Sequence, residues 1–80
     1  PQFAFPPSGA TLDIEPSDPV PVKVRGGEGL TVFVDGVPTG RTDAAGIYFW
    51  QPAGEGFVRL TVMDAAGLSD SVSIRLRSSR

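Results

Sequence analysis

The chain has 80 residues, 40% of them hydrophobic, with 10 glycines, 8 prolines and a net charge of −2. This length suits one domain, and the lack of a basic excess excludes a typical nucleic-acid-binding protein. Because the sequence contains no His and no Cys, it can form neither a Ser-His-Asp triad nor a metal site with imidazole or thiolate ligands.

Apolar and polar residues alternate along most of the chain, which predicts β-strands and almost no helix. The first strand is expected to be split into Gln2–Phe5 and Thr11–Ile14 by the Pro-rich segment between them. Further strands are expected over residues 20–25, 30–34, 47–50, 58–63 and 72–77. About seven short strands with frequent turns predict an all-β, immunoglobulin-like or fibronectin-III-like antiparallel β-sandwich. The residues expected in its core are Val22, Leu30, Val32, Val34, Leu60, Val62, Val72 and Ile74.

The turn residues between these runs support the same architecture. Asp35-Gly36 is typical of a type I′ hairpin turn, and Asp64-Ala65-Ala66-Gly67 suits a type I turn followed by a left-handed glycine. Gly36 and Gly67 are therefore expected to adopt positive φ. Asp43-Ala44-Ala45-Gly46 repeats the second tetrapeptide, and we interpret the repetition as convergent turn chemistry because the flanking residues do not match.

Catalytic side chains are scarce. No Ser lies three residues before Lys23, which is the one Lys of the chain, so the Ser-x-x-Lys motif of penicillin-interacting enzymes is missing. Asp13 and Glu15 could form an acidic pair, but such a pair needs a cleft, and solvated edge charges are the favoured interpretation. A calcium site built from Asp13, Glu15, Asp18 or Asp43 lacks the expected ligand spacing. We predict no enzyme activity, no catalytic residue, no cofactor and no metal site.

The segment Ile47–Trp50 is apolar on both faces of its predicted strand, with Tyr48 and Trp50 pointing one way and Phe49 the other. The favoured interpretation is structural: Trp50 caps one end of the core and Tyr48 hydrogen-bonds at an edge. The alternative makes Tyr48 and Trp50 candidate binding residues that stack on sugar rings or contact a protein. Whichever face is inward, the other needs a cover, supplied by the Pro-rich stretch over residues 15–21 or by another domain.

Four segments together resemble the C-terminal domain of bifunctional penicillin-binding proteins of the 1C type. The family pattern runs approximately Pro-x-x-Gly-Ala, Trp-x-Val-Asp/Asn-Gly, Phe-Trp-x-Pro-x-x-x-Gly and Leu-x-Val-x-Asp-x-x-Gly. Here the corresponding segments occupy residues 6–10, 32–36, 49–56 and 60–69, in the same order. The second segment differs, because Val32 and Phe33 stand where the family often carries a tryptophan. The resemblance covers residues 3 to about 76, nearly the whole chain.

The resemblance implies a domain over residues 1–80 that is cut from a longer peptidoglycan synthase. Such a protein carries glycosyltransferase and transpeptidase domains ahead of this one, is anchored to the inner membrane, and places this domain in the periplasm. The implied role is a non-catalytic accessory domain that contacts those upstream domains or another cell-envelope protein. The alternatives are a peptidoglycan- or carbohydrate-binding module and a structural spacer of a bacterial surface protein. An exposed apolar patch would favour a binding role over the spacer.

Overall fold

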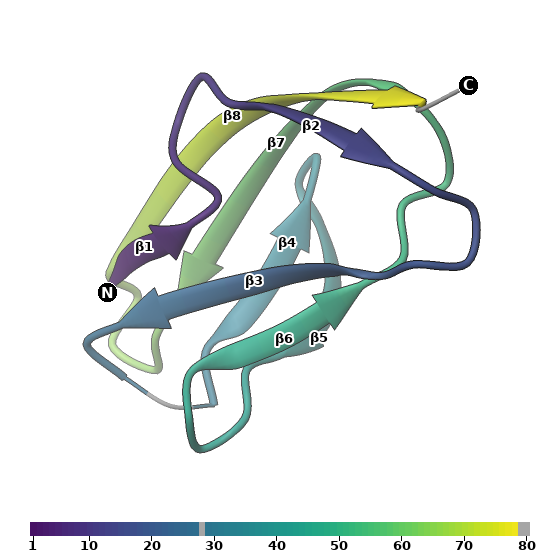
Figure 1. The fold of residues 1–80 in the computed structure, drawn as a ribbon. Coiled ribbons are helices and arrows are strands. Elements are labelled where there is room, and N and C mark those ends of the chain that lie inside the picture. The colour runs from purple at the N-terminus through teal and green to yellow at the C-terminus, as the bar shows by residue number, and fades with distance from the viewer. Residues whose placement is uncertain (28, 79–80) are drawn as a thin grey trace.

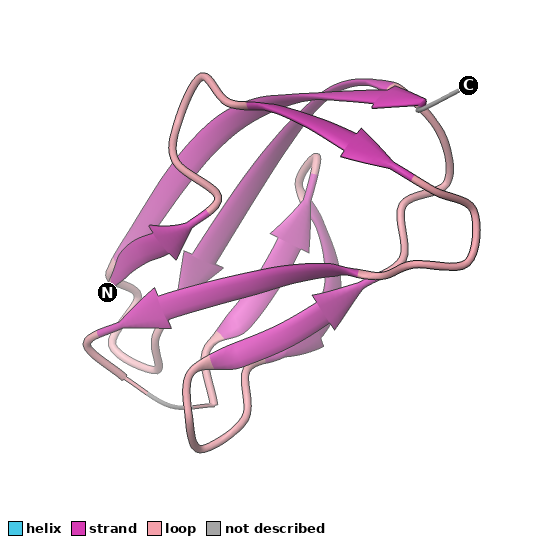
Figure 2. Ribbon diagram, in the orientation of Figure 1, coloured by secondary structure: helices cyan, strands magenta, loops and turns pink. Residues whose placement is uncertain are grey.

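The fold is built from eight β-strands in a computed structural model that describes residues 1–27 and 29–78. They form a three-stranded sheet in the order β1-β3-β6 and a five-stranded sheet in the order β2-β8-β7-β4-β5, which face each other as a sandwich (Figure 1). Strands and loops account for all described residues (Figure 2), so the described part holds no helix that could cross a membrane. The strands are β1 (Gln2–Phe5), β2 (Thr11–Ile14), β3 (Val20–Arg25), β4 (Thr31–Val34), β5 (Val37–Arg41), β6 (Ile47–Trp50), β7 (Gly56–Met63) and β8 (Ser69–Ser78).

The core lies between the sheets and follows the period-2 alternation of the sequence. In β3, for example, Val22 is fully buried while its neighbour Lys23 is exposed, as expected where successive side chains point to opposite faces. Seven of the eight residues predicted to form the core are buried. The prediction is wrong for Val34, which is only partly buried because it lies at the hairpin end of β4, opposite the exposed Val37.

The predicted split of the first strand is confirmed, and its two halves join different sheets. β1 pairs antiparallel with β3, whereas β2 pairs parallel with β8 from Thr11↔Arg75 to Ile14↔Ser78. The expectation of a purely antiparallel sandwich is therefore wrong at this edge. The crossing loop is held to β8 by backbone bonds, since the Gly9 N–H donates to the Ser73 carbonyl (2.7 Å) and the Arg75 N–H donates to the Ala10 carbonyl (2.9 Å).

One strand, β5, was not expected from the sequence, because Pro38 and Gly40 interrupt its alternation. Proline is tolerated there because β5 is the edge strand of its sheet and pairs with β4 alone. Glycine fits at position 40 because a Cβ there would collide with the ring of Tyr48 and force that side chain to move. With β5 and the split first strand, the sandwich has eight strands where about seven were predicted.

The predicted turns are confirmed. Asp35 and Gly36 have φ values of 50° and 83°, as a type I′ hairpin requires, and Gly67 has a φ of 87°. In the Asp64 turn, the Gly67 N–H donates to the Asp64 carbonyl at 3.1 Å, which closes a type I turn before the left-handed glycine.

Candidate interaction surfaces

The aromatic side chains of β6 divide between the core and the surface. Trp50 is only 5% exposed and lies opposite the buried Val20 of β3, so its side chain lies in the core and a binding role for it stays a prediction. Tyr48 is half-buried with its ring against Gly40, and its hydroxyl donates to the Thr39 carbonyl at 3.4 Å. Both side chains thus occupy the structural positions expected of a core cap and an edge contact. Binding through the remaining exposed part of Tyr48 stays a prediction.

The other face of β6 is where apolar surface meets solvent. Phe49 is 62% exposed, and its cross-strand neighbour Pro21 and the nearby Ile47 are half-buried. We call these three residues the Phe49 face. The Pro-rich loop that was expected as a cover reaches only the end of the strand, where the Gln51 side chain donates to the Pro16 carbonyl at 3.0 Å. Of the two covers that the sequence analysis considered, the loop therefore leaves Phe49 exposed, and cover by another domain stays a prediction.

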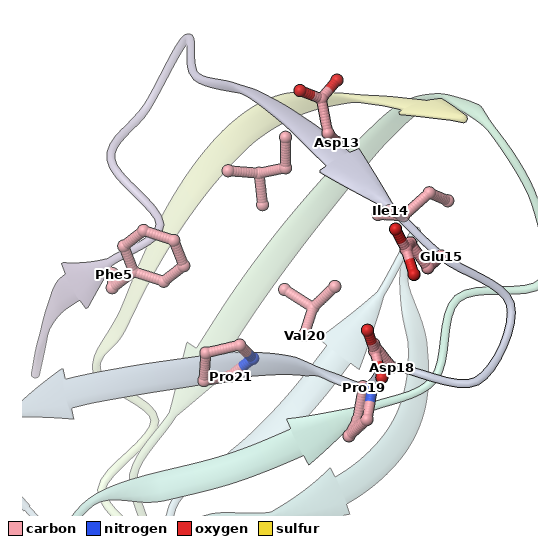
Figure 3. A pocket seen from close by; sticks show the side chains of 9 residues that line it. Phe5, Asp13, Ile14, Glu15, Asp18, Pro19, Val20 and Pro21 are labelled. Carbon is pink, nitrogen blue, oxygen red and sulfur yellow. The ribbon is translucent and has the colours of Figure 1, made fainter. Parts of the chain in front are cut away.

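A cleft of about 330 Å³ opens between β2 and β3, with apolar walls that include Phe5, Leu12 and Val20. Figure 3 shows the rim: Glu15 and Asp18 lie near its Pro19 end, whereas Asp13 points away from Val20 and Pro21. The two acidic residues named in the sequence analysis as a possible catalytic pair, Asp13 and Glu15, are thus not brought together over the cleft.

Asp13 is engaged elsewhere. Its carboxylate accepts a hydrogen bond from the Nε of Arg77 on β8 at 2.9 Å, and both side chains are more than half exposed. This hydrogen bond, and then the charge of Asp13, raise the pKa of the Arg77 guanidinium above its ordinary value. No group of three or more acidic side chains in the described ranges could hold a metal ion. Asp13 therefore links the edge strand β2 to its neighbour β8.

The outer surface of the five-stranded sheet carries a different chemistry, which the sequence analysis missed. Phe57 of β7 is 82% exposed, and the guanidinium of its cross-strand neighbour Arg75 lies 5.7 Å from the centre of its ring. Three further arginines, Arg41, Arg59 and Arg77, are exposed on this surface. Arg59 and Arg77 lie two residues from Phe57 and Arg75 on the same strands, and Arg41 faces the same way through its pairing with β4. We call Phe57 and these four arginines the arginine face. The sequence did contain a sign of this surface. Phe57 is an odd-numbered position next to the inward-facing Val58 and Leu60, so the alternation places this aromatic side chain in solvent.

Comparison with known protein families identifies a relationship for this chain. The model of the Penicillin-Binding Protein C-terminus Family matches residues 1–75 of the 80-residue chain. No curated protein and no solved structure matches it. The match spans all eight strands except the last residues of β8, and it includes the crossing loop, the type I′ hairpin and both Asp-Ala-Ala-Gly turns. The chain therefore belongs to the penicillin-binding protein C-terminus family.

Proposed function

We propose that this chain is a non-catalytic accessory domain of a bifunctional penicillin-binding protein, and that it docks onto a preceding domain of the same protein through the Phe49 face. The family membership supports a position at the C-terminus of such a protein. The parent protein would then be a peptidoglycan synthase anchored to the inner membrane, with this domain in the periplasm. The chemistry of the chain supports a non-catalytic role, because it offers no His, no Cys and no Ser-x-x-Lys motif.

The observation that carries the docking proposal is the exposure of Phe49. A phenyl ring that is 62% exposed beside Pro21 and Ile47 leaves apolar area in water on the outside of a sheet, and burying such area against a partner is favourable. A domain that precedes residue 1 enters through β1, an edge strand of the same three-stranded sheet. Gln2 pairs with Arg25 whereas Phe49 pairs with Pro21, so the start of β1 lies two strand spacings across and four residues along from Phe49, roughly 16 Å in total. A preceding domain is thereby tethered to the sheet that carries the Phe49 face, within reach of that face.

The same proposal includes the finer identity of the fold as an immunoglobulin-like sandwich. It is supported by two packed sheets of short strands and by a first strand divided between them, antiparallel in one sheet and parallel in the other. Domains of this type serve many unrelated functions, so the fold itself adds no activity to the proposal.

Hydroxyl-radical footprinting tests the docking directly, because it reports the oxidation of individual side chains in proportion to their solvent exposure. We expect Phe49 to be oxidised several-fold more slowly in the full-length penicillin-binding protein than in the 80-residue chain. Phe57 provides the internal control: it lies on the opposite sheet and is 82% exposed, so its oxidation should be the same in both proteins.

Equal oxidation of Phe49 in the two proteins would contradict docking within the parent chain and would favour the spacer role. The substitution Phe49→Ser in the full-length protein sharpens the result. We expect it to restore the oxidation of Pro21 and Ile47 to the rate of the isolated chain, because the contact that shields them is lost.

A further inference from the structure

Acidic and basic residues occupy different kinds of structural element in this domain. Apart from Asp13 and Asp70, the described acidic residues lie in turns and loops, whereas the described lysine and arginines all lie within strands. The arginine face receives four of these cations although the whole chain has a net charge of −2. One of the four, Arg77, is paired with Asp13, and the Asp35 carboxylate lies beside Arg59, whose backbone N–H donates to it at 2.9 Å; the cations still outnumber these two carboxylates. The outer surface of the five-stranded sheet is thus a positively charged surface on an acidic domain.

The centre of this surface combines two kinds of contact. Phe57 is the most exposed of the large apolar residues. Arg75 lies opposite Phe57 on β8. Arg59 lies on β7 itself, two residues after Phe57 and about 7 Å away along the strand. An arginine fork binds a carboxylate through two parallel hydrogen bonds, while an aromatic ring stacks on a flat apolar face. Phe57 therefore presents an exposed ring with two carboxylate-binding groups beside it: Arg75 across the strand pair, its guanidinium 5.7 Å from the ring centre, and Arg59 along the strand.

Hydroxyl groups extend this platform along the sheet. Ser73 pairs with Arg59, and the next row holds Thr61 and Ser71, whose hydroxyls are hydrogen-bonded to each other at 2.8 Å. Each hydroxyl retains acceptor capacity after one such bond. A surface with an aromatic ring, arginines and hydroxyls matches a chain of sugar rings that bear carboxylates, because such a polymer offers apolar ring faces, anions and hydroxyls in repetition.

We infer that the arginine face binds a carboxylate-bearing polysaccharide, with Phe57 stacking on a sugar ring and Arg59 and Arg75 binding its carboxylates. The surface lies on the sheet opposite the Phe49 face, so this inference is independent of the docking proposed above. It places sugar stacking on Phe57, whereas the alternative interpretation of the sequence placed it on Tyr48 and Trp50, which are half-buried and buried.

Calorimetric titration of the 80-residue chain with three polymers tests the inference. Polygalacturonate offers sugar rings with carboxylates, chitohexaose offers neutral sugar rings, and polyglutamate offers carboxylates without rings. We expect polygalacturonate to bind most tightly, with an affinity that falls as salt is raised, because the arginine contacts are exposed and screened. Absence of binding to polygalacturonate would overturn the inference. Equal binding of chitohexaose would remove the role of the arginines, and equal binding of polyglutamate would assign the surface to an acidic protein instead.

Matched variants locate the binding surface. Arg59→Glu with Arg75→Glu should weaken polygalacturonate binding by about tenfold or more, since two charge-assisted hydrogen-bonding groups are reversed. Lys23→Glu with Arg25→Glu is the control, because it makes the same change of net charge on the exposed positions of β3 in the other sheet. Equal weakening by the two double variants would mean that net charge alone drives binding, and would overturn the assignment to this face.

The ring is tested separately. Phe57→Ser should weaken binding several-fold, whereas Leu68→Ser, at a 63% exposed apolar residue in a turn, should leave it unchanged. The substituted side chains are exposed, so these variants should fold, and the melting temperature of each checks that they do.

Discussion

The two Asp-Ala-Ala-Gly turns have the same sequence and the same hydrogen bonds but different surroundings. In each, the aspartate Oδ1 accepts from the backbone N–H groups two and four residues later, which are Ala45 and Ile47 in one turn and Ala66 and Leu68 in the other, all at 2.9 Å. The glycine of each turn has a left-handed φ, 79° at Gly46 and 87° at Gly67. The tetrapeptide thus specifies its own conformation locally, as expected for an aspartate that caps its own turn.

The surroundings differ at the glycines. The Gly46 carbonyl accepts a hydrogen bond from the Val24 N–H at 2.9 Å, and a Cβ on Gly46 would lie 2.5 Å from the Val24 carbonyl oxygen. Gly67 is exposed, with nothing within 4 Å of the corresponding position. One turn continues the β3–β6 ladder while the other projects into solvent. The comparison separates the conformation that the turn sequence requires by itself from the additional packing constraint that neighbouring residues impose.

Alanine at the two glycines should give the largest difference. Gly67→Ala should lower the free energy of unfolding by about 1–2 kcal/mol, the cost of a left-handed alanine. Gly46→Ala should add the cost of an overpacked contact to this, for a total of about 2–5 kcal/mol. Urea denaturation measures both.

Asparagine sharpens the same comparison, because it tolerates the left-handed conformation but still carries a Cβ. Gly67→Asn should therefore cost less than Gly67→Ala, whereas Gly46→Asn should keep the cost of the close contact with Val24 and remain more damaging than Gly67→Asn. Equal losses of unfolding free energy at positions 46 and 67 would show that the close approach of Gly46 to Val24 does not affect stability.

Removing the aspartates should have a smaller effect that is the same in both turns. Asp43→Ala and Asp64→Ala each remove an acceptor for two exposed backbone N–H groups, which should cost about 1 kcal/mol. Thermal melting of the two variants should give melting temperatures that agree closely. Asp→Asn variants serve as controls that keep the acceptor oxygen. A marked difference between the two alanine variants would mean that the hydrogen bonds are not equivalent.

The residues that follow the glycines should show the smallest effects. Leu68 is 63% exposed, so Leu68→Ser should change the free energy of unfolding by no more than about 0.5 kcal/mol. Ile47 is half-buried on β6, and Ile47→Ser should cost about 1 kcal/mol, the value of partial burial of an aliphatic side chain. Denaturant midpoints that reverse this order would contradict the exposed setting of the second turn.

The same division between local and distant causes explains what the sequence could predict. Alternation and turn chemistry are local, and they identified the buried side chains of β3, β7 and β8 and the positive φ at Gly36 and Gly67. Alternation could not decide which face of Ile47–Trp50 is inward, because both faces are apolar. That choice follows from the pairing of β6 with β3, which places Trp50 opposite the buried Val20.

Features that depend on a distant partner were missed. β5 has a poor strand sequence, and Gly40 makes sense only beside the ring of Tyr48. Thr42 is buried because its hydroxyl accepts from the Leu30 N–H at 2.9 Å, a bond across twelve residues. The arginine face was also overlooked, because its arginines are spread over three strands of the sequence and become one surface only when the sheet forms.

The parallel pairing of β2 with β8 has a mechanical consequence. β2 leads toward the N-terminus and β8 toward the C-terminus, and they run in the same direction over four paired residues. Once β1 has detached, a force that pulls the two ends apart draws these strands in opposite directions along their own axes. The hydrogen bonds between them, with the Asp13–Arg77 contact beside them, then bear the load together in shear instead of opening one after another. The short edge strand β2 therefore acts as a clamp that resists extension of the domain.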